Sequence, residues 1–149
     1  MNRQFGFERE LYSTLSCLPL AVRYKLDSIG IKITIKQWLA LDMDDRRAIC
    51  EKPAGNDEER RLMTDYVCRL IAQRSGEKPS FLSIEQQATA LQTRHMPAAI
   101  AEQAGSLGYE LDANRWKMLD EDQRYALLKF AGDDRRRVKF AAALEEFLG

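Results

Sequence analysis

The stretch that decides the fold is Leu18–Glu51, which reads LPLAVRYKLDSIGIKITIKQWLALDMDDRRAICE. It has a second copy 78 residues further on, where Met96–Lys129 reads MPAAIAEQAGSLGYELDANRWKMLDEDQRYALLK. Aligned without a gap, ten of the 34 positions are identical, whereas composition alone would give about two. Both tryptophans of the chain fall at equivalent positions. The sequence therefore predicts two related halves built on one framework.

The identical residues predict a helix, a glycine cap, a tryptophan turn and a second helix in each half. Proline suits the first turn of a helix, where its missing N–H is harmless. A glycine that follows an apolar stripe is typical of a left-handed C-cap, and an aspartate before the next stripe is typical of an N-cap. The framework residues of the two halves are Pro19, Gly30, Trp38 and Asp42, and Pro97, Gly108, Trp116 and Asp120.

We interpret both tryptophans as large core side chains that fix a turn against the longer helices. Asp42 and Asp120 also lie four residues before Arg46 and Arg124, the spacing of an acid–base pair on a helix. A cap contributes about 1 kcal/mol and a surface pair only about 0.3–0.5 kcal/mol. We therefore expect the aspartates to stabilise the protein more than the arginines do.

The fold class predicted is mostly α, as a single compact helical domain with an internal duplication. Its halves cover about 18–51 and 96–129, joined by helices at about 56–75 and 83–94. A C-terminal helix is expected over about 134–148, with Val138 on its buried side, and Gly132 is expected to end the helix before it.

At most a minor two-stranded β pairing is expected in addition to the helices. Ile31–Ile33 and Tyr109–Leu111, the three residues after each capping glycine, alternate like short extended pieces. They are the candidates for one β-bridge between the halves.

Composition limits the classes of partner. At 149 residues the chain has the size of one domain. Lys+Arg 23 against Asp+Glu 23 leaves no net charge, which disfavours non-specific binding to nucleic acid and makes a helical DNA-binding module the weakest alternative. No apolar stretch approaches the roughly 20 residues of a membrane span, and the first residues lack the apolar core of a secretory signal. We expect a cytoplasmic protein with no membrane and no nucleic-acid partner.

The cysteines and the single histidine give no catalytic or metal-binding pattern. Cys17, Cys50 and Cys68 are widely spaced, and His95 has no ligand or nucleophile at a recognisable spacing. We predict no metal, no cofactor and no enzymatic activity. Cys17 is the best candidate for a reactive thiol, because it lies just before a helix whose N-terminal dipole lowers a thiol pKa. A small-ligand or thiol-dependent activity near Cys17 is therefore the alternative function.

The two halves differ in their basic and bulky side chains, which are present in one half and absent from the equivalent positions of the other. If the halves pack face to face, Arg23, Lys25, Arg124 and Lys129 share one exposed surface, and such a basic patch suits an acidic partner or an anionic ligand. Scattered surface charge is the other interpretation. The candidate binding residues are Arg23, Lys25, Asp27, Gln123, Arg124 and Lys129.

Two long motifs carry a resemblance to a known family. The first has the pattern Cys-Ile-Pro-Met-x-Val-Arg-x-Lys-Leu-Asp-x-x-Gly-Ile-Lys-Leu and is followed by a tryptophan. This chain matches it at Cys17, Pro19, Val22, Arg23, Lys25, Leu26, Asp27, Gly30, Ile31 and Lys32. The second has the pattern Trp-x-x-Leu-x-x-x-Gln-Arg-Phe-Ala-Leu-x-Lys. It is matched by Trp116, Leu119, Gln123, Arg124, Ala126, Leu127 and Lys129.

By these motifs the chain resembles the conserved nitrate reductase-associated protein family. The resemblance implies a small cytoplasmic accessory protein that binds assimilatory nitrate reductase, or a related molybdoenzyme, and aids its maturation or activity. It implies no known reaction. One departure is that residues 132–138 contain no histidine, where the family tends to have a His-Glu-Asn stretch. A role that depends on that imidazole is therefore not carried over.

Overall fold

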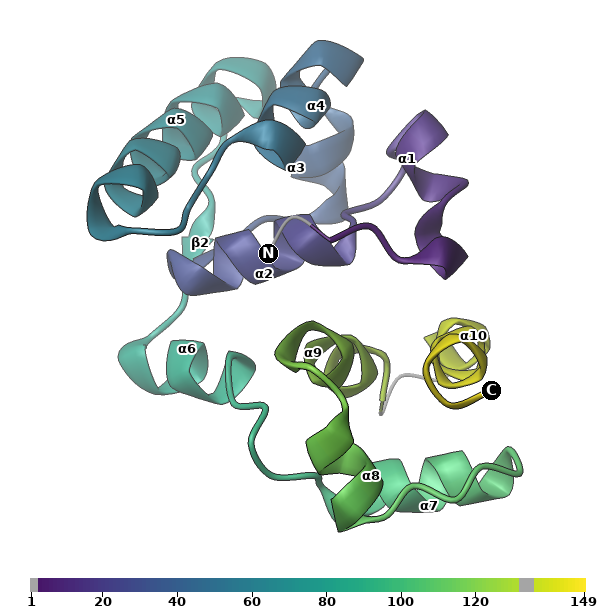
Figure 1. Cartoon of the computed structure of the whole chain (residues 1–149). Helices are drawn as coiled ribbons and strands as arrows, with labels where there is room; N and C mark the ends of the chain where they lie inside the picture. The colour runs from purple at the N-terminus through teal and green to yellow at the C-terminus, as the bar shows by residue number, and fades with distance from the viewer. Residues whose placement is uncertain (1–2, 132–135) are drawn as a thin grey trace. The chain divides into compact units, whose positions relative to one another are not determined.

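A computed structural model describes residues 3–131 and 136–149 (Figure 1). The chain is mostly α-helical, and its described residues contain one two-stranded antiparallel pair. This confirms the predicted fold class. The chain divides into two compact units, Met1–Leu91 and Gln92–Gly149, called here the N-terminal and C-terminal units. The single domain expected from the sequence stays a prediction, and each unit is described by itself.

The N-terminal unit contains one 3-10 turn, six α-helices and both strands. The 19-residue helix α5 is much longer than its neighbours. In chain order the elements are η1 (Gly6–Glu8), α1 (Leu11–Thr14), α2 (Leu20–Ser28), β1 (Ile31–Lys32), α3 (Ile35–Leu39), α4 (Met43–Glu51), α5 (Asp57–Ser75), β2 (Ser80–Phe81) and α6 (Ile84–Ala90).

The core of this unit lies where α3 meets α5 and α2 meets α4. Trp38 is fully buried there, among apolar side chains of α2 and α5 such as Val22 and Val67. Val22 and Leu26 lie one helical turn apart, so α2 presents an apolar stripe to the core. The short helices are therefore held by packing on one face rather than by their own length.

The described part of the C-terminal unit contains the α-helices α7 (Ala98–Ser106), α8 (Ala113–Met118), α9 (Glu121–Phe130) and α10 (Arg137–Leu148). Helices α9 and α10 lie side by side (Figure 1). Tyr125 and Phe140, one from each helix, are buried.

The predicted glycine and aspartate caps are present in both units. Gly30 and Gly108 have φ of +72° and +86°, the left-handed conformation that costs glycine little. Asp42 accepts a hydrogen bond from the Asp45 N–H at 2.8 Å, and Asp120 accepts one from Gln123 at the same distance. The N3 side chain returns a bond to the backbone N–H of the cap in both helices, which completes two capping boxes.

Each tryptophan is tied to a backbone carbonyl 23 residues before it. Trp38 Nε1 donates to Leu15 O at 2.8 Å, and Trp116 Nε1 donates to Thr93 O at 3.1 Å. Both indoles are buried, so each bond satisfies a donor that would otherwise be lost to water. Equivalent bonds at equivalent positions support the predicted duplication.

Arg46 and Arg124 also make equivalent contacts, but these are hydrogen bonds to backbone carbonyls and not the ion pairs with Asp42 and Asp120 expected from the sequence. Arg46 donates to the carbonyls of Trp38 and Leu39 at 3.3 and 3.2 Å. Arg124 donates to those of Trp116 and Lys117 at 3.1 and 3.2 Å. These carbonyls lie at the ends of the tryptophan helices, where intrahelical N–H donors run out. Trp38 O and Trp116 O also accept a bond from the Leu41 and Leu119 N–H, each at 3.2 Å. Each arginine is thus a C-terminal cap for the preceding helix, so it contributes more than a surface ion pair.

The partner expected for the first extended piece is wrong. Ile31–Lys32 pairs antiparallel with Ser80–Phe81 of the same unit, not with Tyr109–Leu111. The Tyr109 N–H instead donates to Ala104 O at the end of α7. The chain leaves α5 at Gly76 and passes buried Pro79, and Leu82 N then donates to Gly30 O at 2.7 Å.

Two helices differ from the sequence prediction. Helix α6 ends at Ala90 rather than near residue 94. In α10 Val138 is 81% exposed, and the buried residues are Phe140, Ala143 and Leu144. Val138 was assigned to the wrong face because a run of apolar residues hides the 3.6-residue period. Residues 132–135, including Gly132 and part of the departure from the family motif, lie outside the described residues.

We predict that Arg46→Ala lowers the free energy of unfolding by about 1–2 kcal/mol, because it removes two charge-assisted bonds to helix-terminal carbonyls. Asp42→Ala should cost about 1 kcal/mol through its lost cap. Urea unfolding measures both. The matched control is Arg47→Ala, at the next, exposed position of α4. Equal stability of the Arg46 and Arg47 variants would contradict the capping role.

Candidate functional site

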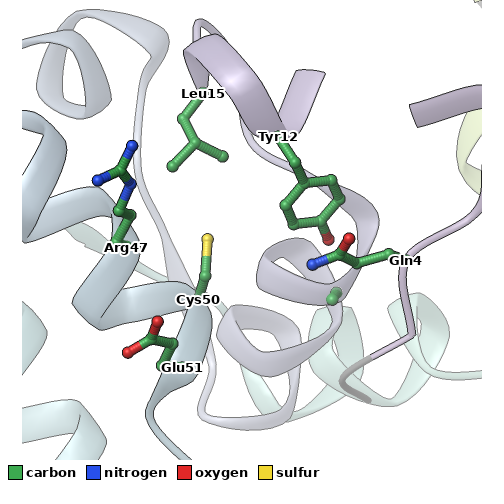
Figure 2. Close-up of a pocket in the computed structure, with 7 residues that line it drawn as sticks. Gln4, Tyr12, Leu15, Arg47, Cys50 and Glu51 are labelled. Atoms are coloured by element: carbon green, nitrogen blue, oxygen red, sulfur yellow. The ribbon is translucent and has the colours of Figure 1, made fainter. Parts of the chain in front are cut away.

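A pocket of about 440 Å³ opens in the N-terminal unit (Figure 2). Its volume lies within the range typical of small-molecule sites. Four segments build it: the chain before η1, helix α1 with its C-cap, helix α2 and helix α4. The lining residues are Gln4, Tyr12, Leu15, Ala21, Arg47, Cys50 and Glu51.

Leu15 forms part of the pocket wall and has an energetically unfavourable backbone conformation. Its φ of +48° is the one positive value among the described non-glycine residues, and it costs an L-residue about 1–2 kcal/mol. Its carbonyl accepts from Trp38 Nε1 at 2.8 Å and from Arg46 Nη1 at 3.4 Å. The tryptophan helix therefore fixes the wall, and the side chain is 1% exposed.

A buried carboxylate joins the N-terminal segment to α2. Glu8 Oε2 accepts a hydrogen bond from Leu20 N at 3.0 Å, next to Pro19, the N-cap of α2. Proline offers no side-chain cap, so the carboxylate from η1 takes that role and also meets the positive end of the helix dipole. Phe5, three residues earlier, is buried and anchors the same segment.

Lys25 connects α2 to the end of α4, where Cys50 of the pocket wall lies. Its Nζ donates to Ile49 O at 2.8 Å, to Lys52 O at 2.9 Å and also to Cys50 O. The carbonyls at a helix C-terminus carry partial negative charge and attract a cation. Burial lowers the pKa of Lys25, while the three acceptors stabilise its ammonium form.

Burial favours the neutral forms of two groups in the pocket wall, the Cys50 thiol and the Tyr12 phenol. Desolvation raises the pKa of the Cys50 thiol, and the Lys25 ammonium opposes that shift only in part. Desolvation also raises the pKa of Tyr12, with a further contribution from Glu8. At neutral pH the pocket thus offers a neutral thiol and a neutral phenol beside the charged Arg47 and Glu51.

The structure divides the predicted binding residues between the two units. Arg23 and Asp27 are half-buried on α2, and Gln123, Arg124 and Lys129 are half-buried on α9. Lys25 is 2% exposed, so its predicted place in an exposed basic patch is wrong. Nothing in the sequence pattern of an amphipathic helix indicates that one of its lysines donates hydrogen bonds to the carbonyls at the end of a distant helix.

The α9 residues also serve the fold. Gln123 completes the capping box of Asp120, Arg124 caps α8, and Lys129 Nζ lies 5.3 Å from the centroid of the Tyr125 ring. The binding role of Arg23, Asp27, Gln123, Arg124 and Lys129 stays a prediction, and only Lys25 is removed from the exposed patch because it is buried.

Sequence reasoning missed the pocket. Cys17, its candidate thiol, is half-buried and does not line the pocket, whereas Cys50 does. Residues such as Gln4 and Tyr12 belong to no motif, and only tertiary packing brings them to α4. Exposed His95 lies outside the pocket. Groups of three or more His, Cys, Asp or Glu residues that could hold a metal do not occur in the described part of the chain.

The fold and the site together define a small helical protein with a half-open pocket in its N-terminal unit. A family model described as "Conserved nitrate reductase-associated protein" matches residues 4–147. The chain belongs to this family. No curated protein and no solved structure matched the chain. Among the described helices, none combines the length and apolar character that a membrane span needs.

We predict that Lys25→Met lowers the free energy of unfolding by about 3 kcal/mol, since it leaves one buried and two partly buried carbonyls without their donor. Lys32→Met, at an exposed position of β1, is the control and should change stability by less than about 0.5 kcal/mol. Chemical denaturation of both variants provides the comparison. A loss no larger than that of the control would show that the carbonyls find other partners.

The raised pKa of Tyr12 predicts a loss of stability at alkaline pH. The native state keeps the phenol proton above pH 10, where the unfolded chain releases it, so stability falls as pH rises beyond about 10. The loss is at most about 1.4 kcal/mol per pH unit, and less because the phenol is partly solvated. Thermal melts from pH 8 to about 11 should therefore show a steeper decline for wild type than for Tyr12→Phe. Tyr109→Phe is the control, and identical slopes for wild type and Tyr12→Phe would contradict the prediction.

Proposed function

We propose that this protein is a non-enzymatic accessory protein that binds nitrate reductase and aids its maturation or activity. The observation that carries the proposal is the family match, which extends over residues 4–147. Membership in a family described by its association with nitrate reductase makes that enzyme, or a related molybdoenzyme, the first partner to test.

The state of the thiols supports a binding role rather than a catalytic one. Burial raises the pKa of both Cys50 and Cys68, and a neutral thiol is a poor nucleophile. A thiol-dependent activity at Cys17 remains the alternative hypothesis, and thiol labelling at neutral pH distinguishes the two. Labelling of Cys17 faster than a free model thiol would favour the alternative.

The contacts proposed for the reductase are Arg23 and Asp27 on α2 in the N-terminal unit and, independently of these, Lys129 on α9 in the C-terminal unit. Lys25 is left out because it is buried, and Gln123 and Arg124 are left out because their side chains cap helix ends. Lys129 is kept, although its ammonium also lies near the Tyr125 ring. Charges at the rim of an interface act mainly on association rate and specificity, so we expect each one to make a modest contribution to affinity.

The test is capture of nitrate reductase by the tagged full-length protein from nitrate-grown cells, detected with antibody against the reductase. Arg23→Ala and Lys129→Ala should each lower the captured amount by about threefold to tenfold. Arg61→Ala, at an exposed position of α5, is the matched control and should capture as wild type does. Undiminished capture by both variants would reject Arg23 and Lys129 as contacts, while nitrate reductase would still be the proposed partner.

Deletion of the gene for this protein tests the accessory role independently of any surface. We expect normal amounts of nitrate reductase polypeptide with reduced specific activity, restored by the wild-type protein. Normal reductase activity in the deletion strain, together with no capture by the wild-type protein, would reject the proposed function.

A further inference from the structure

We propose that the pocket of the N-terminal unit binds a small zwitterion, an α-amino acid with an apolar side chain. The proposal concerns a small molecule and does not depend on the association with nitrate reductase. It rests on the size of the pocket, on the opposite charges of Arg47 and Glu51 in its wall, and on the apolar residues of that wall.

The apolar part of the pocket wall suits an apolar side chain. Leu15 is 1% exposed and Ala21 is 4% exposed, and Tyr12 stands beside them as a half-buried ring. Burial of an aliphatic side chain of four carbons against such a surface is favourable by the ordinary hydrophobic effect. The Leu15 wall is already fixed by Trp38 and Arg46, so little ordering cost remains when a ligand binds.

The charges on the wall are one cation and one anion. Arg47 and Glu51 lie four residues apart on α4, on the same face of the helix, with Cys50 beside them. Figure 2 shows the Cys50 sulfur pointing into the space between Arg47, Leu15 and Tyr12, with Glu51 beneath it. Across residues 3–131 and 136–149, neither Arg47 nor Glu51 has an ion-pair partner. Both groups are therefore available to a ligand.

Charge balance selects the ligand class. The remaining polar groups of the wall are neutral, namely the Tyr12 phenol, the Cys50 thiol and the Gln4 amide. A simple anion would meet Arg47 but be repelled by Glu51, and a simple cation would face the reverse problem. A molecule that carries a carboxylate and an ammonium on the same carbon, as an α-amino acid does, complements both charges, through a charge-assisted bond to each.

Titration of the ¹⁵N-labelled full-length chain with L-leucine, followed by amide chemical shifts, tests the proposal. At about 10 mM ligand, a site with a Kd of about 1 mM is about nine-tenths filled. We expect saturable shifts at residues of α1 and α4 around the pocket. L-leucinamide, which lacks the carboxylate, and 4-methylpentanoate, which lacks the ammonium, should each bind at least about tenfold more weakly.

Charge-neutral variants test the residues assigned. Arg47→Gln and Glu51→Gln should each weaken leucine binding by about tenfold or more. Arg61→Gln and Glu58→Gln, exposed positions of α5 outside the pocket, are the controls and should bind as wild type does. All four positions are exposed, so the variants should fold, and the reference amide spectrum verifies this.

Three outcomes would overturn the proposal. The first is the absence of shifts around the pocket with L-leucine, L-methionine and L-phenylalanine at the same concentration. The second is equal binding of leucine, leucinamide and 4-methylpentanoate, and the third is unchanged binding in the Arg47 and Glu51 variants. Nitrate reductase is absent from this experiment, so its result is independent of the proposed function.

Discussion

The hydrogen bond from a buried indole N–H to a carbonyl 23 residues earlier is the constraint on which both units depend. In the N-terminal unit it joins Trp38 to Leu15 at 2.8 Å, and in the C-terminal unit it joins Trp116 to Thr93 at 3.1 Å. A buried indole needs an acceptor, and these segments supply one only when the chain folds back on itself. The bond thus fixes the segment before the proline helix and, in the N-terminal unit, holds Leu15 in its left-handed conformation beside the pocket.

Buried polar groups connect the short helices of the N-terminal unit. Glu8 caps the start of α2, and Lys25 caps the end of α4. Helices of four to nine residues are marginal by themselves, and their terminal N–H and C=O groups need partners. Residues that resemble a binding motif in the sequence therefore serve, in part, to connect helix ends.

The fold was predictable in outline because its signals are local. Asp42 and Asp120 cap helices through bonds to residues three positions away, and Gly30 and Gly108 end helices by their own backbone freedom. Predictions that required knowledge of a distant partner were less successful. The alternating pattern predicts Tyr109–Leu111 as the partner of Ile31–Lys32, whereas the strand pairs with Ser80–Phe81. The spacing of Arg46 predicts an ion pair with Asp42, whereas its carbonyl acceptors Trp38 O and Leu39 O lie in α3. Lys25 was placed on the surface although it is buried.

The sequence by itself determined the helical class, the positions of the caps and the family, since each is written in short patterns or long motifs. Only the tertiary structure decided which side chains form the pocket. No sequence motif links Gln4, Tyr12 and Cys50, and they line one pocket only because the folded chain brings their segments together. The physical reason is one of range: capping and periodicity act over a few residues, whereas a pocket is formed by contacts between segments that the chain keeps more than thirty positions apart.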